Sequence, residues 1–350
     1  MPLDDNVLDL KKQYIRALEQ ELVSRDGLPR GCDVNSIYFG GGTPTLFAPH
    51  ELERVLNVVA KNFNVTHDAE ISIEMNPQDV NALPELKSIG FNRFTMGVQT
   101  LSEKLHKTIG RSGELCTIRQ LETFFSVTDV THCIDVIGGI PGQTLEDLAA
   151  ELKQIVSFKP EHISAYLLTL EAEAPLVIDF DDGLAMLQRD IFLETKRILE
   201  AGTYTHYEIS NYALAGFESK HNMKYWTYEP YIGLGAGAHS FYNNRRFINS
   251  MTVGEYIQKP AGIIEEDVRS LNSAMAEYIM MSLRLLRGFS TNDFAHEFGA
   301  PLPHETEQRI KEEAEKGMLE ITEENSIVKI SREGLIFTDS IIYNVVRDLL

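Results

Sequence analysis

The sequence predicts an α/β fold in which a parallel sheet curls into a barrel, followed by an α-rich C-terminal region. Strand-like and helix-like stretches alternate from residue 36 to residue 168, and repeated strand–helix units form parallel sheets. The predicted strands are apolar on one face and polar on the other. Because a parallel sheet covered by helices on both faces is apolar on both, the polar face favours a barrel that holds a polar ligand at the carboxyl ends of its strands.

The order of the elements follows from their apolar periodicity. An amphipathic helix over 9–22 comes first, because apolar residues recur there at helical spacing. The elements predicted for the barrel then follow in turn: strand 36–39, a helix from 49, strand 70–75, helix 81–89, strand 93–98, helices 101–109 and 115–125, strand 131–137, helix 144–156 and strand 162–168. Beyond them we expect a helix over 184–199, an aromatic and glycine-bearing region over 204–247, and an α-rich tail from 267 whose helices and β-like runs at 319–322 and 327–330 resemble a winged-helix module.

Side-chain parity along the predicted strands shows which face is polar. In the strand over 70–75, Ile73 lies on one face and Ser72 and Glu74 lie on the other. The strands over 93–98 and 131–137 alternate in the same way. Polar groups or glycines therefore stand at five strand ends: Gly40–Gly42, Glu74, Gln99, Asp135 and Thr169. Each one alone is equally well explained as a solvated strand end, whereas five together favour a ligand site.

The composition is that of a globular protein and excludes some partners. Of the 350 residues, 43% are hydrophobic and 24% are charged, and the formal net charge is −20. Because this charge repels polyanions and no run of Lys and Arg offsets it, we expect no nucleic-acid partner. No apolar stretch is long enough for an integral membrane segment and no signal peptide is recognisable, so we expect a cytoplasmic protein. Cys32, Cys116 and Cys133 suit reduced thiols and lack metal-ligand spacing.

Three glycines, Gly40, Gly41 and Gly42, follow the first predicted strand. Glycine loses the most backbone freedom on folding, and bare backbone can adopt positive φ and approach a ligand closely. The stretch lacks the Gly-Lys-Ser/Thr of a P-loop and the spaced glycines of a dinucleotide-binding fold. It favours a ligand-contacting loop of another type, with a plain tight turn as the alternative.

Six stretches, in order and without large gaps, resemble one family: 39–45 (FGGGTPT), 73–77 (IEMNP), 96–99 (MGVQ), 110–111 (GR), 134–144 (IDVIGGIPGQT) and 221–226 (HNMKYW). From about Tyr14 to its C-terminus, the chain resembles the radical S-adenosylmethionine (SAM) proteins related to oxygen-independent coproporphyrinogen III oxidase. Within that family it is most similar to the haem chaperones of the HemW type. The resemblance implies a partial (β/α)6 barrel, here expected without its first strand, that holds SAM at its carboxyl mouth.

The resemblance also implies which residues contact SAM. The family's contacts fall on Gly41, Gly42, Thr43 and Glu74 for the methionine amino end, on Gln99, Arg111 and Asp135 for further SAM atoms, and on Thr169 and His239 for looser contacts. Asp135 suits hydroxyl groups, because a carboxylate accepts hydrogen bonds. Several of these residues are those that strand parity places inward.

The stretch over 221–226 resembles the signature that separates the haem chaperones from the oxidase proper. His221 offers an imidazole as an axial iron ligand, and Tyr225 and Trp226 offer flat apolar surface for a porphyrin. Without the family, the same residues indicate the start of a surface helix with an ordinary histidine and a buried tryptophan. The resemblance favours the haem interpretation.

One family feature is missing from the sequence. The family ligates a 4Fe–4S cluster through a Cys-x3-Cys-x2-Cys run, and Cys32, Cys116 and Cys133 are too widely spaced to replace it. The chain is either an N-terminally shortened form or a natural relative that has lost the cluster. We expect the first, because the SAM-facing residues remain and a missing first strand would leave an open sheet edge. We expect no cluster-dependent activity from these 350 residues.

The leading hypothesis is a haem chaperone that binds haem and SAM and delivers haem to haem-accepting proteins. One alternative is an oxygen-independent coproporphyrinogen III oxidase, which needs the missing cysteines, and another is a cluster-less SAM-binding regulator. The expected domains are the partial barrel over 1–172, a connecting region with the haem motif over 173–265 and a winged-helix-like domain over 266–350. The sequence does not decide between a monomer and a homodimer.

Overall fold

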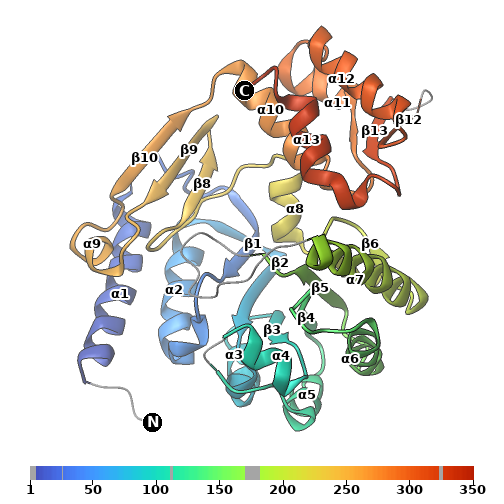
Figure 1. The fold of residues 1–350 in the computed structure, drawn as a ribbon. Helices are drawn as coiled ribbons and strands as arrows, with labels where there is room; N and C mark the ends of the chain where they lie inside the picture. The colour runs from blue at the N-terminus through green and yellow to red at the C-terminus, as the bar shows by residue number, and fades with distance from the viewer. Residues whose placement is uncertain (1–4, 26, 111–112, 170–181, 323–325) are drawn as a thin grey trace.

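The computed structural model describes residues 5–25, 27–110, 113–169, 182–322 and 326–350. In this part of the chain the largest sheet has seven strands, in the order β1-β2-β3-β4-β5-β7-β6 (Figure 1). Its strands are β1 (Asp33–Phe39), β2 (Asn64–Met75), β3 (Arg93–Gln99), β4 (Thr131–Gly138), β5 (His162–Leu167), β6 (Thr205–His206) and β7 (Asn211–Ala213). Strands β1 to β5 run parallel, whereas β7 is antiparallel to β5 and β6. The sheet curls into a half-barrel, which confirms the predicted α/β partial barrel.

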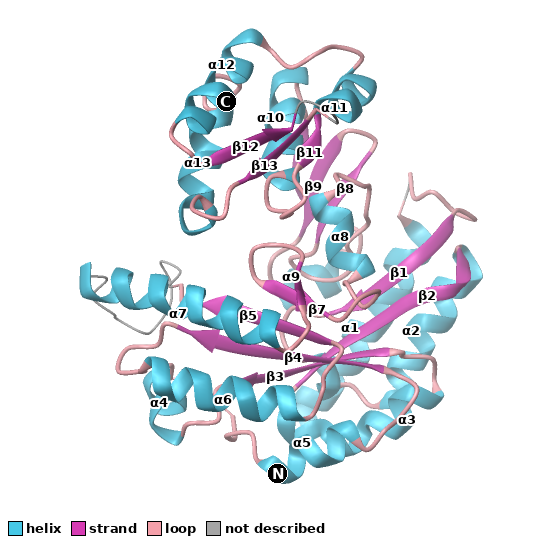
Figure 2. Ribbon diagram, turned by 90° about the vertical axis from the view of Figure 1, so that its right-hand side faces the viewer, coloured by secondary structure: helices cyan, strands magenta, loops and turns pink. Residues whose placement is uncertain are grey.

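Helices connect the parallel strands and cover the outer face of the sheet (Figure 2). The helices of this part are α1 (Asp5–Ser24), α2 (Pro49–Asn62), α3 (Leu83–Ser88), α4 (Glu103–Thr108), α5 (Ile118–Phe125), α6 (Leu145–Ser157) and α7 (Asp182–Ala201). Helix α6 shows how the sequence builds them. The Thr144 side chain caps it by accepting a hydrogen bond from the backbone N–H of Asp147. Leu148 and Leu152 are buried one turn apart, and each buried leucine contributes about 1.5–3 kcal/mol, which holds the helix on the sheet.

The hydrophobic core lies between these helices and the outer face of the sheet. Ile73 of β2, Phe94 of β3 and Ile134 of β4 are fully buried there. Residues of the opposite parity point to the inner face of the half-barrel. The register pairs Gly97 of β3 with Asp135 of β4, so the inward residues of neighbouring strands lie side by side.

A second, antiparallel sheet lies beside α1 and was not indicated by the sequence patterns. Among the described residues its strand order is β10-β9-β8, with β8 (His239–Tyr242), β9 (Arg245–Asn249), helix α9 (Val253–Gln258) and β10 (Ile263–Val268). Asn249 donates a hydrogen bond of 2.8 Å to the buried Glu21 of α1, which joins the sheet to the half-barrel. All residues of β10 are exposed and do not alternate in polarity, so its sequence carries no strand signal. Strand β10 crosses the division expected between residues 265 and 266, and that division stays a prediction.

The C-terminal region combines helices with a small three-stranded sheet. Its elements are α10 (Leu271–Ser282), β11 (Phe289–Ser290), α11 (Thr291–Phe298), α12 (His304–Glu315), β12 (Leu319–Thr322), β13 (Ile327–Ile330) and α13 (Thr338–Val346). Among the described residues the sheet order is β11-β13-β12, with all pairs antiparallel. Phe294, Ile310 and Val328 are buried between the sheet and the helices. This succession of elements is that of a winged helix, which confirms the predicted module.

Helix α8 (Lys220–Trp226) lies between the half-barrel and the C-terminal region (Figures 1 and 2). It contacts β1 on one side and α10 on the other. The stretch over 221–226 is therefore enclosed by two parts of the molecule and does not form a free surface helix.

Candidate functional site

Polar side chains line the inner face of the half-barrel on each parallel strand. They alternate with the buried core residues, because successive side chains of a strand point to opposite faces. The inward set is Ser36 and Tyr38 of β1, Glu70, Ser72 and Glu74 of β2, Arg93 and Thr95 of β3, Cys133 and Asp135 of β4, and His162, Ser164 and Tyr166 of β5. We call the carboxyl ends of these strands the mouth of the half-barrel.

At the mouth, the glycine loop packs around a tyrosine–glutamate pair. The Tyr38 hydroxyl donates a hydrogen bond to the Glu74 carboxylate. A Cβ on Gly40 would lie 2.7 Å from Glu74 Oε1 and closer still to the Tyr38 ring, so only glycine fits there. Gly41 and Gly42 follow with φ of +73° and +115°, and no atom lies within 4 Å of the positions that their Cβ atoms would take. Their exposed backbone is open to a ligand.

Two carboxylates give the mouth its electrostatic character. Burial raises the pKa of Tyr38 and the pKa of Tyr166, and the charges of Glu74 and Asp135 add to the rise in both. The four side chains therefore share one environment, as strand parity predicted for the two carboxylates. Such a pair favours a ligand that brings a cation or several hydroxyl donors.

The other residues predicted for SAM are more widely spread. Gln99 ends β3 with φ of +66°, a left-handed conformation that is rare outside glycine, and is 7% exposed. Thr43 is half-buried directly after the glycine loop, and Thr169 is exposed beyond the end of β5. His239 is exposed on β8 and thus belongs to the second sheet. Arg111 lies outside the described residues.

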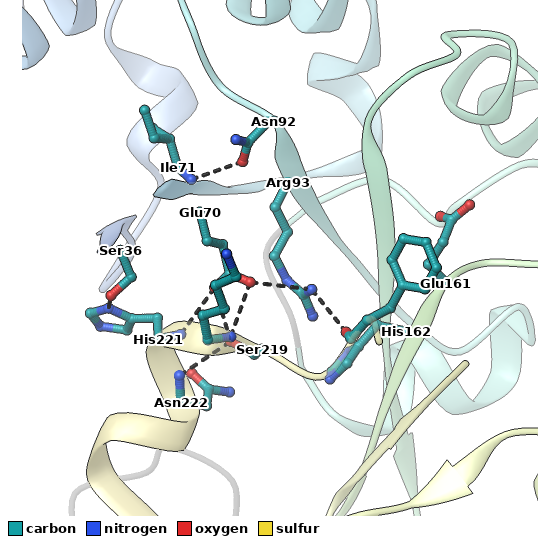
Figure 3. Close-up of polar contacts among 12 residues, drawn as sticks. Ser36, Glu70, Ile71, Asn92, Arg93, Glu161, His162, Ser219, His221 and Asn222 are labelled. Atoms are coloured by element: carbon teal, nitrogen blue, oxygen red, sulfur yellow. Dashed lines mark hydrogen bonds and ion pairs between the residues drawn. The ribbon is translucent and has the colours of Figure 1, made fainter. Parts of the chain in front are cut away.

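Helix α8 is held against the sheet through its amino end (Figure 3). Glu70 of β2 accepts hydrogen bonds from the backbone N–H groups of Lys220 and His221, at 3.0 and 3.1 Å. The Ser219 hydroxyl donates to the same carboxylate at 3.3 Å, and Arg93 Nη1 lies 3.5 Å from it. A carboxylate at a helix N-terminus satisfies N–H groups that have no partner within the helix. Glu70 therefore positions the helix that carries the 221–226 stretch.

The imidazole of His221 is enclosed by three side chains. Its Nδ1 lies 3.2 Å from Ser36 Oγ, and its Nε2 lies 2.8 Å from the Tyr225 hydroxyl. The Tyr38 ring stacks on it, with 5.0 Å between ring centres and 10° between ring planes. Burial lowers the pKa of His221 to about 4, so the imidazole is neutral near pH 7. Neutral imidazole is the form that ligates a metal.

Tyr225 and Trp226 reach different neighbours. Tyr225 packs edge-on against Tyr231, with ring centres 4.6 Å apart, and burial raises the pKa of Tyr225 to about 12. The Arg284 guanidinium, just beyond α10, lies 5.5 Å from the centre of the Trp226 ring. Among the described residues, the buried Trp226 Nε1 has no hydrogen-bond partner. The stretch thus faces β1 through His221 and the C-terminal region through Trp226.

The three cysteines do not form a metal site. Cys32 is exposed ahead of β1, whereas Cys116 and Cys133 are buried. Burial raises the pKa of Cys116 and the pKa of Cys133 to about 12, so neither is a thiolate near pH 7. Within the ranges that the structure describes, no group of three His, Cys, Asp or Glu side chains could hold a metal ion. The residues present therefore do not fit a 4Fe–4S cluster, which needs neighbouring thiolates.

Among the inward residues that were not named as site residues from the sequence, four hold His221 and the amino end of α8: Ser36, Tyr38, Glu70 and Arg93. Strand parity contains part of the signal, because Ser36 and Tyr38 lie on the same face of the strand as Gly40, and Glu70 lies on the same face as Glu74. The missing part is that α8 returns to these strands from 150 residues further along the chain, as the contact of Lys220 with Glu70 shows.

Comparisons with known proteins agree with this architecture. The model of the Radical SAM superfamily matches residues 13–155, and that of the HemN C-terminal domain matches residues 270–337. Proteins named heme chaperone HemW from Bacillus subtilis and Buchnera aphidicola subsp. Schizaphis graminum are 32% and 30% identical to this chain. The alignments cover 92% and 88% of this chain, and 88% and 84% of those proteins.

One solved structure is similar along almost the whole chain. It is that of coproporphyrinogen III oxidase (HemN) from Escherichia coli, described as a radical SAM enzyme. The similarity covers 96% of this chain and 83% of that chain, with a TM-score of 0.81 and 21% sequence identity. At this identity the likeness shows the fold alone.

The half-barrel, its glycine loop and the winged-helix region together define a radical SAM protein with the HemN-like architecture. Because the Bacillus subtilis relative is 32% identical over 92% of the chain, the chain belongs to the HemW family of radical SAM proteins. None of the helices in the described ranges is long and apolar enough to cross a membrane.

Proposed function

We propose that this protein is a haem chaperone, which binds haem through helix α8, binds SAM at the mouth of the half-barrel and passes haem to acceptor proteins. The observation that carries the proposal is the state of His221, a neutral, oriented imidazole within the 221–226 stretch. The names of the relatives support it, since both are called heme chaperones.

In this proposal His221 supplies the iron ligand. When Nδ1–H donates to Ser36 Oγ, the lone pair of Nε2 is directed to iron, and the hydrogen bond at Nδ1 fixes the orientation of the ring. In the structure that lone pair faces the Tyr225 hydroxyl at 2.8 Å. Haem binding therefore exchanges the hydrogen bond from Tyr225 for the bond to iron. Tyr225 and Trp226 supply ring surface for the porphyrin.

SAM is proposed to bind where the glycine loop meets the two carboxylates. The open backbone of Gly41 and Gly42 and the Glu74 carboxylate suit the amino end of the methionine part, because an ammonium forms strong hydrogen bonds with a carboxylate. The Asp135 carboxylate suits hydroxyl groups. Further contacts are proposed for Thr43, Gln99, Arg111, Thr169 and His239. The proposal includes no radical step, since the described residues do not fit the cluster.

Titration of the purified chain with haemin tests the haem proposal. Absorption in the Soret region should show saturable binding, and His221→Ala should weaken it at least tenfold, which corresponds to about 1.4 kcal/mol of binding free energy. His296→Ala is the control, because His296 is exposed on α11, away from α8. Absent binding, or equal binding by both variants, would contradict the proposal.

The haemin titration and equilibrium dialysis with SAM together separate the alternatives. A cluster-less SAM-binding regulator would bind SAM in equilibrium dialysis but would show no His221-dependent haemin binding. An oxygen-independent coproporphyrinogen III oxidase needs three neighbouring thiolates, and the likeness to HemN at 21% identity supports the fold only. The haem-chaperone proposal predicts saturable haemin binding without any cluster.

A further inference from the structure

One tyrosine contacts both proposed sites. Tyr38 of β1 donates its hydroxyl hydrogen to Glu74 at the mouth, and the same ring stacks on the His221 imidazole at 5.0 Å and 10°. Among the described residues, Tyr38 alone makes a hydrogen bond or ring contact with both Glu74 and His221. The residue is 36% exposed, so it lies at the edge of an accessible space.

The Tyr38 side chain has little freedom to move at one of these contacts without moving at the other. On the mouth side, the Cα of Gly40 packs so closely against the Tyr38 ring and Glu74 that a Cβ would overlap both. On the other side, Ser36, two residues earlier on the same face of β1, lies 3.2 Å from Nδ1 of His221. A change at the Glu74 carboxylate therefore reaches the imidazole through one rigid ring.

We propose that Tyr38 couples the two sites, so that a ligand whose ammonium group binds Glu74 strengthens haem binding at His221. The inference rests on the proposed function of both sites and adds the residue that joins them. Tyr38 uses Glu74 Oε1, and among the described residues Oε2 has no hydrogen-bond partner, so an ammonium binds there without displacing the hydroxyl. The ammonium restrains the carboxylate, and through it the Tyr38 ring that supports His221. By thermodynamic linkage, haem strengthens the binding of that ligand by the same factor.

Because the proposed coupling needs an ammonium group at Glu74, the coupling is tested with a ligand that carries this group and one that lacks it. SAM carries the ammonium group that the Glu74 carboxylate would bind, whereas adenosine does not. SAM therefore tightens haemin binding, and adenosine at the same concentration leaves it unchanged. This difference attributes the coupling to the Glu74 end of the mouth and not to general filling of the half-barrel.

The test is a set of haemin titrations with and without saturating SAM, with SAM binding measured separately by equilibrium dialysis. In the natural chain we expect SAM to tighten haemin binding about fivefold, at the lower end of common coupling factors. Tyr38→Phe keeps the stacked ring and removes the hydroxyl, so the ratio of the two haemin affinities should fall to about one. Tyr166→Phe is the matched control, because Tyr166 shares the two carboxylates but makes no described contact with His221.

Each outcome has a distinct meaning. If haemin and SAM both bind the natural chain and neither changes the affinity of the other, the coupling is wrong while the proposed function stands. If haemin or SAM fails to bind, the corresponding half of the proposed function fails, and the coupling fails with it. A fivefold effect that persists in Tyr38→Phe overturns the role of this residue. Far-UV circular dichroism shows that each variant is folded, and the titration of the natural chain alone already decides whether the two sites are coupled.

Discussion

Replacing Tyr225 with phenylalanine should tighten haemin binding. In the structure the Tyr225 hydroxyl lies 2.8 Å from Nε2 of His221, on the lone pair that iron would use. The burial that raises the pKa of Tyr225 to about 12 keeps this hydroxyl protonated, so it acts as a competing donor near neutral pH. Phenylalanine removes the competitor and retains the ring that packs against Tyr231.

The size of the effect follows from the hydrogen bond that haem must displace. The net contribution of one hydrogen bond is about 0.5–1.5 kcal/mol. Since about 1.4 kcal/mol corresponds to a factor of ten, haemin should bind about two- to twelvefold more tightly to Tyr225→Phe than to the natural chain.

The assay is the Soret titration, performed at one pH on the natural chain, on Tyr225→Phe and on a control variant. Tyr231→Phe is the control, because its hydroxyl accepts a hydrogen bond of 2.8 Å from Arg246 and does not touch His221. Weaker haemin binding by Tyr225→Phe than by this control would refute the reasoning, because the hydroxyl would then support the bound haem and not compete with it. Equal binding by the two variants would refute it as well.

Two further predictions concern stability. Glu70→Gln leaves the buried Arg93 without its charged partner, and breaking a buried ion pair costs about 3–5 kcal/mol of folding free energy. The unfolding midpoint of this variant in urea should therefore fall well below that of the control Glu265→Gln, which changes a residue on the exposed β10. Equal midpoints for the two variants would contradict this prediction. Burial lowers the pKa values of His221 and His206 from 6.5 to about 4, so below about pH 6.5 the unfolded chain takes up protons that the folded chain does not. The free energy of unfolding should therefore fall as the pH is lowered from about 6.5 to 4, with a smaller fall in His221→Gln, and urea titrations that show no loss between pH 7 and 5 would contradict it.

The alternation of strands and helices predicted a parallel sheet, side-chain parity favoured a barrel, and the family resemblance implied that the barrel is partial. The strand expected over 131–137 is Thr131–Gly138, and the helix expected over 144–156 is Leu145–Ser157. Both depend on periodicity within one segment, and the capping pair of Thr144 and Asp147 is equally local. The same parity placed Glu74 and Asp135 on one face, and the charges of both act on Tyr38.

Elements without local signals were missed. Strand β10 has the sequence Ile-Ile-Glu-Glu-Asp-Val, which does not alternate, and it forms because β9 offers a partner edge. The residue type also does not predict the left-handed φ of Gln99, at +66°, because such a conformation in a non-glycine residue is imposed by its surroundings. In the helical C-terminal region, by contrast, helical periodicity and the β-like runs at 319–322 and 327–330 carried a local signal, and β12 and β13 form at those positions.

By itself, the sequence determined the alternating strands and helices, the polar inner face, the glycine loop and the membership of a family, since all of these depend on local order or on motifs read along the chain. Only the tertiary structure decided that α8 packs between the half-barrel and the C-terminal region, that Glu70 binds its amino end and that Ser36 and Tyr38 contact His221. These contacts join residues up to 185 positions apart. Their geometry depends on how whole elements pack against one another, and periodicity within one segment does not predict such long-range contacts.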